Sequence, residues 1–182
     1  MEKTIILSEQ DILENIQNIA GRIIEKNPSI DKVVMVGIRT GGAYLAVRIQ
    51  EAIARLNESP PPIGILDITL YRDDWTKIGP TPVVRKTELP FSIDDMVVIL
   101  VDDVLFTGRT VRAAMDALMD YGRPKKIELA ILIDRGESYR EIPVMANYIG
   151  GIWKTSQEET INVYLKEEGF HDHAAIEKRN SA

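Results

Sequence analysis

The chain has 182 residues, 28 acidic against 22 basic side chains, and no cysteine. This length fits one compact domain, which we expect to span residues 1–182, and the absence of cysteine excludes disulfides and thiol chemistry. The net charge of -6 disfavours a generally basic, nucleic-acid-binding surface.

The apolar segments of the sequence are short. The longest runs, such as Val97–Val101, have the length of a strand and fall far below the roughly 20 residues that a membrane-spanning helix needs. The first ten residues lack the apolar stretch of a signal peptide. We therefore expect a cytoplasmic protein without membrane association.

Helical and extended patterns alternate along the chain. Ser8, followed by acidic residues, predicts a helix start, and isoleucines at helical spacing continue to Asn27. Predicted strands follow at 33–37, 63–71, 96–101, 127–133, 148–149 and 161–165, and further predicted helices at 43–56, 110–121 and 170–179. This alternation predicts an α/β fold with a mostly parallel sheet flanked by helices.

One stretch interrupts this alternation. Residues 71–90 are rich in proline and in charged side chains. A connection of this length exceeds the usual loop, and such loops commonly serve as lids over functional sites. We expect a flexible lid at about 71–90.

The strongest chemical signal lies at 98–110. An apolar strand runs into Asp102 and Asp103 and then into a Thr-Gly-Arg-Thr loop at 107–110, directly before a predicted helix. Hydroxyls, backbone N–H groups and the positive end of a helix dipole suit a phosphate. The two carboxylates suit vicinal hydroxyls, or Mg²⁺ held through water. Together they predict a site for a ribose 5-phosphate.

Other phosphate-binding classes are disfavoured. The sequence contains neither the G-x-x-x-x-G-K-[ST] loop of P-loop proteins nor the G-x-G-x-x-G pattern of dinucleotide-binding folds. A plain strand end followed by a turn is the structural alternative, but two acids on a buried strand would be costly without a ligand.

The segment Val98–Thr110 resembles the 5-phosphoribosyl 1-pyrophosphate (PRPP) signature of type I phosphoribosyltransferases. Thr69–Asp74, Val104–Ala114 and Tyr121–Pro124 narrow the resemblance to the PyrR family of bifunctional pyrimidine operon attenuation proteins and uracil phosphoribosyltransferases. The resemblance covers about Ile6 to Leu165. It implies the type I phosphoribosyltransferase fold, Mg²⁺ as cofactor, and conversion of uracil and PRPP to UMP and pyrophosphate by a homodimer or a dimer of dimers.

The resemblance also implies roles for individual residues. Asp102 and Asp103 would bind the ribose hydroxyls and, through water, Mg²⁺, and they would form the catalytic set together with Arg72. The expected PRPP-binding residues are Arg39, Thr40, Gly41, Gly42, Asp102, Asp103, Val104, Leu105, Phe106, Thr107, Gly108, Arg109 and Thr110. The expected base pocket contains Arg135, Ile152 and Arg85. Related purine enzymes carry an acid at the position of Phe106, so its phenyl ring favours a pyrimidine.

The sequence departs from the family's pattern at three places. Gly41 stands where many members have arginine, the segment after Gly136 lacks a histidine and has Met145 in place of an arginine, and Gly151 stands where lysine is usual. Because phosphate contacts by Lys and Arg dominate RNA affinity, these changes favour an enzyme over an RNA-binding regulator. The alternative is a regulator that senses pyrimidine nucleotides and binds leader RNA. A purine salvage transferase is a third hypothesis.

Overall fold

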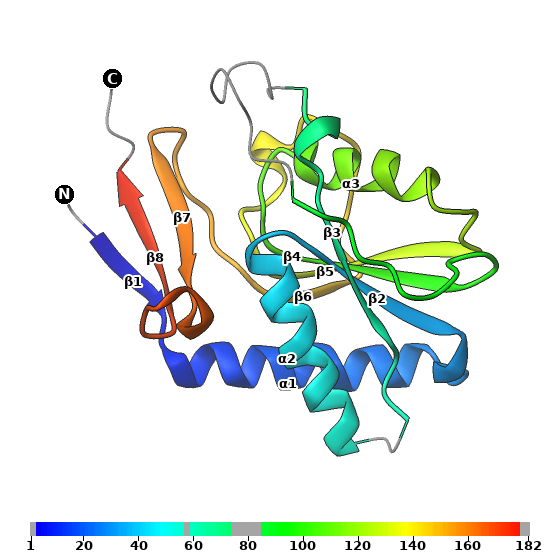
Figure 1. Ribbon diagram of the computed structural model, residues 1–182. Helices are drawn as coiled ribbons and strands as arrows, with labels where there is room; N and C mark the ends of the chain where they lie inside the picture. Colours follow the sequence, from blue (N-terminus) through cyan, green and yellow to red (C-terminus); the bar gives the residue numbers. More distant parts are fainter. Residues whose placement is uncertain (1–2, 57–58, 74–84, 179–182) are drawn as a thin grey trace.

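The computed structural model describes residues 3–56, 59–73 and 85–178, and its α/β architecture confirms the predicted fold class (Figure 1). Five parallel strands form the main sheet in the order β3-β2-β4-β5-β6. They span Val33–Ile38 (β2), Ile63–Leu66 (β3), Val97–Leu105 (β4), Lys126–Asp134 (β5) and Tyr148–Ile152 (β6). The helices span Glu9–Lys26 (α1), Gly41–Leu56 (α2) and Arg109–Met119 (α3).

Helices cover both faces of the main sheet. Met35 and Ile99 belong to a core shared with α1 and α2, whereas Val36 and Leu100 belong to a second core shared with α3. The central strand β4 is therefore buried on both faces, which explains its unbroken apolar run. No helix in the described ranges combines the length and apolar character needed to cross a membrane.

The first helix forms as predicted. Ser8 caps α1, with its side chain accepting a hydrogen bond from the backbone of Asp11 while the Asp11 carboxylate accepts one from the backbone of Ser8. The isoleucines at helical spacing are buried, and Asn27 closes the helix by donating to the carbonyl of Ile23. Local sequence and packing agree here, so the prediction from the pattern is confirmed.

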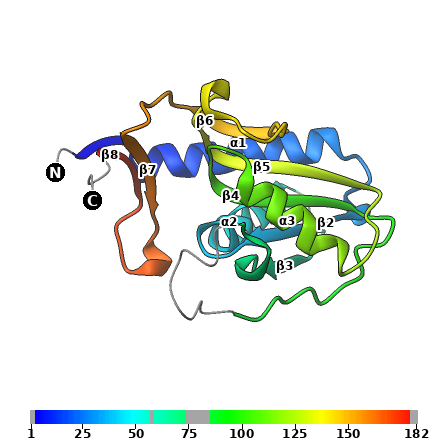
Figure 2. The same ribbon diagram turned by 90° about the horizontal axis from the view of Figure 1, so that it is seen from above.

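A small antiparallel sheet lies beside the main one (Figures 1 and 2). It pairs Lys3–Leu7 (β1) with His173–Lys178 (β8), and β8 with Glu159–Tyr164 (β7). The predicted terminal helix at 170–179 is wrong, because β1 and β7 satisfy the backbone of this segment from both sides. Strand β1 was not predicted. Arg48 of α2 holds the small sheet in place through ion pairs with Glu167 and Asp172, both at 2.6 Å.

The predicted strand at 63–71 is shorter than expected. It ends at Leu66, where the carboxylate of Asp67 accepts a hydrogen bond from the backbone N–H of Thr69 at 2.8 Å. This contact turns the chain into a short 3-10 helix, η2 (Thr69–Tyr71). Most of the predicted lid lies outside the described residues. Its returning end pairs with β3, through two backbone hydrogen bonds of 2.8 Å between Ile65 and Glu88.

Candidate active site

The structure brings the predicted site segments to one edge of the main sheet. Because the strands are parallel, their carboxyl ends meet there, and Gly37 of β2 lies beside Val101 of β4. Leu105, Asp134 and Ile152, at the ends of β4, β5 and β6, form one row across the sheet. The loops that follow β2, β4, β5 and β6 therefore surround a common region.

Asp102 and Asp103 lie at the centre of this edge. Asp102 is 7% exposed, and its carboxylate accepts a hydrogen bond from the backbone N–H of Asp103 at 3.0 Å. The Asp103 carboxylate accepts one from the backbone of Val104 at 2.7 Å. Burial and the neighbouring charge of Asp103 raise the pKa of Asp102 well above its usual value, while the charge of Arg72 acts in the opposite direction. Burial likewise raises the pKa of Asp103. Such a pair is suited to receive hydroxyl donors or a cation.

The glycines after β2 allow a close approach to these carboxylates. A Cβ on Gly42 would lie 2.2 Å from the carbonyl oxygen of Val101, so any side chain there would push the loop off β4. A Cβ on Gly41 would lie 2.7 Å from Oδ2 of Asp103. Helix α2 begins directly at Gly41, so the loop Thr40–Gly42 places backbone N–H groups at a helix start beside the carboxylate pair.

The loop after β4 has the geometry of a phosphate site. Gly108 adopts a φ of 90°, which favours glycine, and α3 begins at the next residue. The carbonyl of Thr107 accepts hydrogen bonds from Glu141 and Ile142 at 2.9 and 3.1 Å, which fixes the loop from outside. Beside it lies a cavity of about 390 Å³ lined by Arg72, Asp73, Phe106, Thr107, Arg109, Thr110 and Glu141. Arg72 and the helix N-terminus make this cavity suitable for an anion, whereas the guanidinium of Arg109 in the lining is paired with carboxylates.

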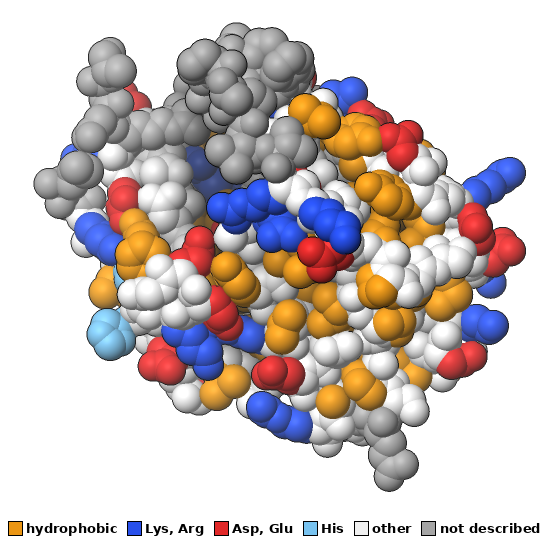
Figure 3. All heavy atoms as spheres, viewed as in Figure 1, with side chains coloured by type: hydrophobic (Ala, Val, Ile, Leu, Met, Phe, Trp, Pro, Cys, Tyr) orange, Lys and Arg blue, Asp and Glu red, His pale blue; other side chains and the backbone are white. Residues whose placement is uncertain are grey.

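The arginine of this loop lines the cavity with its side chain already paired to two carboxylates. The guanidinium of Arg109 pairs with Asp73 and, through Nε at 2.5 Å, with Glu141. The side chain of Arg109 therefore connects the base of the predicted lid to the loop after β5. Its backbone N–H group is part of the phosphate loop at the start of α3. On the face seen in Figure 3, Lys and Arg side chains gather around one acidic side chain in the upper middle of the molecule.

Arg39 and Arg85, both predicted site residues, lie near Asp67, which the sequence analysis did not single out. One terminal nitrogen of Arg39 donates to the carbonyl of Lys86 at 3.1 Å, and its buried Nε has no hydrogen-bond partner among the described residues. The backbone of Arg85 donates to Asp67 at 2.5 Å. Although burial works to raise it, hydrogen bonds from Thr69 and Arg85 and the charge of Arg39 hold the pKa of Asp67 below its usual value. Asp67 thus connects the turn just before the predicted lid to Arg85 in its returning part.

The base side of the site is built around Phe106. The guanidinium of Arg135 lies over its ring, 3.6 Å from the centroid, and Tyr139 meets the ring edge-on at 5.6 Å. Arg135 is 3% exposed and donates to Thr155, Ser156 and Glu159, so its side chain supports the site from behind. Ile152, in contrast, is 60% exposed at the end of β6 and offers an open apolar surface.

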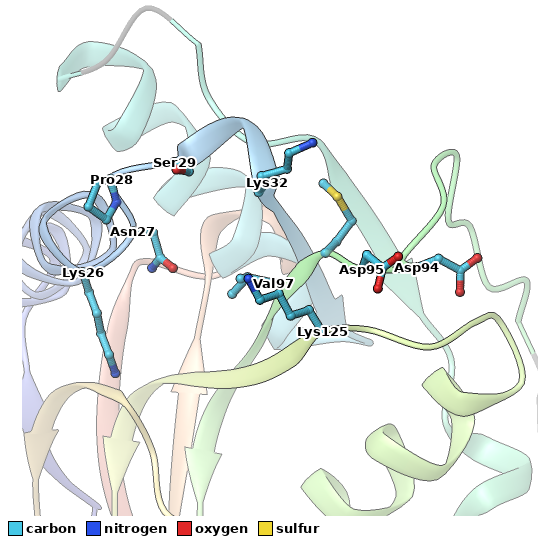
Figure 4. Close-up of a pocket in the computed structure, with 10 residues that line it drawn as sticks. Lys26, Asn27, Pro28, Ser29, Lys32, Asp94, Asp95, Val97 and Lys125 are labelled. Atoms are coloured by element: carbon cyan, nitrogen blue, oxygen red, sulfur yellow. The ribbon is translucent and has the colours of Figure 1, made fainter.

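A second hollow, of about 660 Å³, lies at the opposite edge of the sheet (Figure 4). Its lining includes Lys26, Lys32 and Lys125, but also Asp94 and Asp95. The side chains of Lys26 and Lys32 point in different directions, and Lys26 lies 3.6 Å from the carboxylate of Glu128. The lysines therefore do not converge on one anion, unlike the groups at the carboxyl edge.

Comparison with known proteins agrees with this geometry. Residues 3–160 match the family model described as the phosphoribosyl transferase domain. The chain is 50% identical over 177 residues to the bifunctional protein PyrR of Desulfosudis oleivorans, an alignment that covers 97% of each chain. It is 48% identical over 177 residues to the bifunctional protein PyrR of Bacillus subtilis, covering 96% of this chain and 97% of the relative.

Solved structures show the same fold. The hypoxanthine phosphoribosyltransferase of Trypanosoma cruzi, in complex with the product IMP, matches with a TM-score of 0.66 at 18% identity, covering 85% of this chain and 78% of that chain. At this identity the likeness concerns the fold alone. The predicted family and type I phosphoribosyltransferase fold are therefore confirmed. The chain belongs to the phosphoribosyltransferase family and, within it, to the PyrR family.

Proposed function

We propose that this PyrR-family protein transfers the phosphoribosyl group of PRPP to uracil, giving UMP and pyrophosphate. The observation that carries the proposal is the pair of buried Asp102 and half-buried Asp103, followed by the Gly108 turn and the start of α3. The first part suits two ribose hydroxyls and the second suits the 5-phosphate of the same sugar. A PRPP molecule satisfies both parts, whereas a free phosphate satisfies only the second and a free base satisfies neither.

Different residues bind the ribose, the 5-phosphate and the pyrophosphate of PRPP. Asp102 and Asp103 accept hydrogen bonds from the ribose hydroxyls, and backbone groups of 107–110 bind the 5-phosphate. Backbone N–H groups of Thr40–Gly42 face the pyrophosphate, and Arg72 adds positive charge there. In the reaction, N1 of uracil forms a bond to C1 of the ribose as the bond from C1 to pyrophosphate breaks, and the N1 proton leaves to solvent. The donors around the pyrophosphate stabilise the charge that develops on it.

The carboxylate pair also suits Mg²⁺. This ion keeps several waters and commonly uses one or two carboxylates together with substrate phosphates. Asp102 and Asp103 provide two adjacent carboxylates with raised pKa values, whose charged forms a cation would favour. In the described residues no group of three or more potential ligands forms a protein-only metal site. Mg²⁺ bound with PRPP would supply positive charge to the leaving pyrophosphate.

Uracil fits the base side better than a purine does. Phe106 presents a phenyl ring held by Arg135, and a phenyl ring cannot accept a hydrogen bond from a purine nitrogen. Ile152 offers an exposed apolar surface for stacking. Arg135 acts through Phe106 in this arrangement, and Arg85 contributes its backbone to Asp67.

Initial rates with uracil, hypoxanthine, guanine and orotate, each with PRPP and Mg²⁺, test the proposed substrate. We expect turnover of uracil to exceed that of the other bases. Thr107→Val should raise the KM for PRPP more than the KM for uracil, with Thr4→Val, at an exposed position of β1, as the control outside the site. Turnover of a purine in preference to uracil would contradict the proposal.

The second candidate function is binding of pyrimidine-operon leader RNA, which the name of the relatives favours. The structure adds to the departures in the sequence. Met145 is 77% exposed, and a Cβ on Gly151 would lie 2.1 Å from the ring of Trp153, so Trp153 fills the space beside that position. Arg140 is committed to Asp134 at 2.7 Å. We therefore place catalysis first.

A gel shift with the leader RNA, with and without UMP, separates the two functions. Tight binding that UMP strengthens would favour the regulator, and weak binding that vanishes at moderate salt would favour the enzyme alone. We further propose a cytoplasmic homodimer or dimer of dimers with one domain per chain. Light scattering coupled to size exclusion checks the assembly, and a monomer would contradict it.

A further inference from the structure

Phe106 forms a wall between two adjoining cavities. One is the cavity of about 390 Å³ at the phosphate loop, and the other, of about 460 Å³, is lined by Tyr139, Arg140 and Gln157 among others. Both contain Phe106, Thr107 and Glu141 in their lining. The position of the Phe106 ring therefore decides how much room a base has beside the sugar site.

The backbone of Phe106 is held in place by its neighbours. Arg140 donates to its carbonyl at 2.6 Å and pairs with the buried carboxylate of Asp134 at 2.7 Å. The preceding residue, Leu105, accepts a hydrogen bond from the backbone of Arg135 at 3.0 Å. These contacts fix the backbone of Phe106, whereas the orientation of its ring depends on side-chain packing.

Arg135 and Tyr139 both contact the ring. Arg135 closes one face of the ring, and its own guanidinium is fixed by hydrogen bonds of 2.8 to 3.1 Å to Thr155, Ser156 and Glu159. Tyr139 meets the ring at an interplanar angle of 61°, a favourable edge-to-face contact. Arg135 comes from the end of β5, whereas Tyr139 comes from the 3-10 turn η4 (Glu137–Tyr139) that follows it.

We propose that Tyr139 determines base specificity by holding Phe106 as a fixed wall that admits a single-ring base and excludes a two-ring base. Tyr139 is a positioning residue, since it acts on the substrate through Phe106. The proposal deepens the proposed function and rests on it. With Tyr139 truncated, the Phe106 ring can turn toward the cavity beside Gln157, and the base site becomes wider and less well defined.

The test compares Tyr139→Ala, Tyr139→Phe and the wild type. For Tyr139→Ala we expect the KM for uracil to rise about two- to tenfold, the range expected for loss of an aromatic pair. The ratio of kcat/KM for uracil to that for hypoxanthine should fall, while the KM for PRPP stays within about twofold. Tyr139→Phe keeps the ring and should behave as wild type. Tyr121→Ala, at an exposed tyrosine after α3, is the matched control.

Equilibrium binding of UMP and GMP to the same variants measures the preference for a single-ring base independently of catalysis. A wild type that binds UMP more tightly, with a preference that shrinks in Tyr139→Ala and returns in Tyr139→Phe, supports the role of Tyr139. An unchanged preference in Tyr139→Ala, or an equal rise in the KM values for uracil and PRPP, overturns it and leaves the proposed function intact. A wild type that prefers the purine in both assays contradicts the proposed function and this inference together.

Discussion

Two groups of buried acids lie at opposite ends of the same sheet and differ in their partners. At the amino end of β5, Glu128 has a fully buried side chain that accepts hydrogen bonds from Tyr148 and Lys126, both at 2.5 Å. At the carboxyl end of β4, the carboxylates of Asp102 and Asp103 each accept a hydrogen bond from the backbone of the next residue. The carboxylate of Glu128 therefore has its hydrogen-bond partners within the protein. The carboxylates of Asp102 and Asp103 can still bind hydroxyl groups or a cation.

The pKa values express the same difference. Burial works to raise the pKa of Glu128, but hydrogen bonds from Lys126, Tyr148 and Asn27 bring it below its usual value. Burial and mutual repulsion raise the pKa of Asp102. A buried acid whose charged form is stabilised by hydrogen bonds within the protein adds to the stability of the fold. A buried acid whose charged form is destabilised is a candidate for binding a ligand that compensates its charge.

The largest expected effect comes from removing the charge of the carboxyl-edge pair. Asp102→Asn with Asp103→Asn should lower kcat/KM by about 10²–10³-fold, as loss of a key polar contact in an active site typically does. The melting temperature should rise, because a buried carboxylate and its half-buried, repelling neighbour are replaced by neutral amides. Steady-state kinetics and thermal unfolding measure the two effects. Retained PRPP affinity together with a lower melting temperature would show that Asp102 and Asp103 stabilise the fold and do not bind PRPP.

Removing one partner at the amino edge should do the reverse. Tyr148→Phe deprives the buried carboxylate of Glu128 of a hydrogen bond of 2.5 Å, and we expect a loss of about 1–3 kcal/mol of unfolding free energy. The KM values for uracil and PRPP should not change, because the site lies at the other end of the sheet. Chemical denaturation measures the loss.

Tyr164→Phe is the matched control for that loss. Tyr164 donates to Glu177 at 2.6 Å in the small sheet, but both residues are partly exposed and Glu177 also accepts from Asn162 at 2.9 Å. We expect less than about 1 kcal/mol. Equal losses for the two tyrosines would show that burial of Glu128 adds nothing.

The pH dependence of stability should separate the two groups. The contribution of Glu128 is present above its usual pKa of 4.5 and is lost as the pH falls through its lowered pKa. The penalty at Asp102 is absent below its usual pKa of 3.8, and it grows as the pH rises from there through the raised pKa. The stability gained by Asp102→Asn with Asp103→Asn should therefore be largest at neutral pH and shrink toward about pH 4. Denaturant titrations at several pH values check this, and a gain that grows on acidification would contradict it.

The smallest expected effect concerns Gly41. The Cβ of Gly41→Ala would lie 2.7 Å from Oδ2 of Asp103, so the carboxylate must move slightly. We expect the KM for PRPP to rise about two- to fivefold with stability nearly unchanged. Gly21→Ala is the control, since its Cβ would meet nothing within 4 Å in α1 and should add about 0.5–1 kcal/mol of stability. Identical kinetics for the two variants would show that Asp103 is not confined by this loop.

The sequence was most informative where a contact is local in the chain. The capping of α1 by Ser8, the strand that runs into Asp102 and Asp103, and the glycine turn before α3 each depend on residues within a few positions of one another. Hydrophobic period and turn chemistry are properties of such short windows, so these features and the fold class could be predicted. The resemblance of 98–110 to a PRPP signature then identified the family.

The tertiary structure decided what depends on residues far apart. Residues 173–178 form a strand because β1, at the other end of the chain, pairs with it, and pairing partners are invisible in a short window. The side chain of Arg109 turns to Asp73 and Glu141, and Arg135 stacks on Phe106. A guanidinium can pair with any nearby carboxylate or aromatic ring. The identity of an arginine therefore predicts the kinds of partner it can have, but only the tertiary structure determines which partner lies close to it.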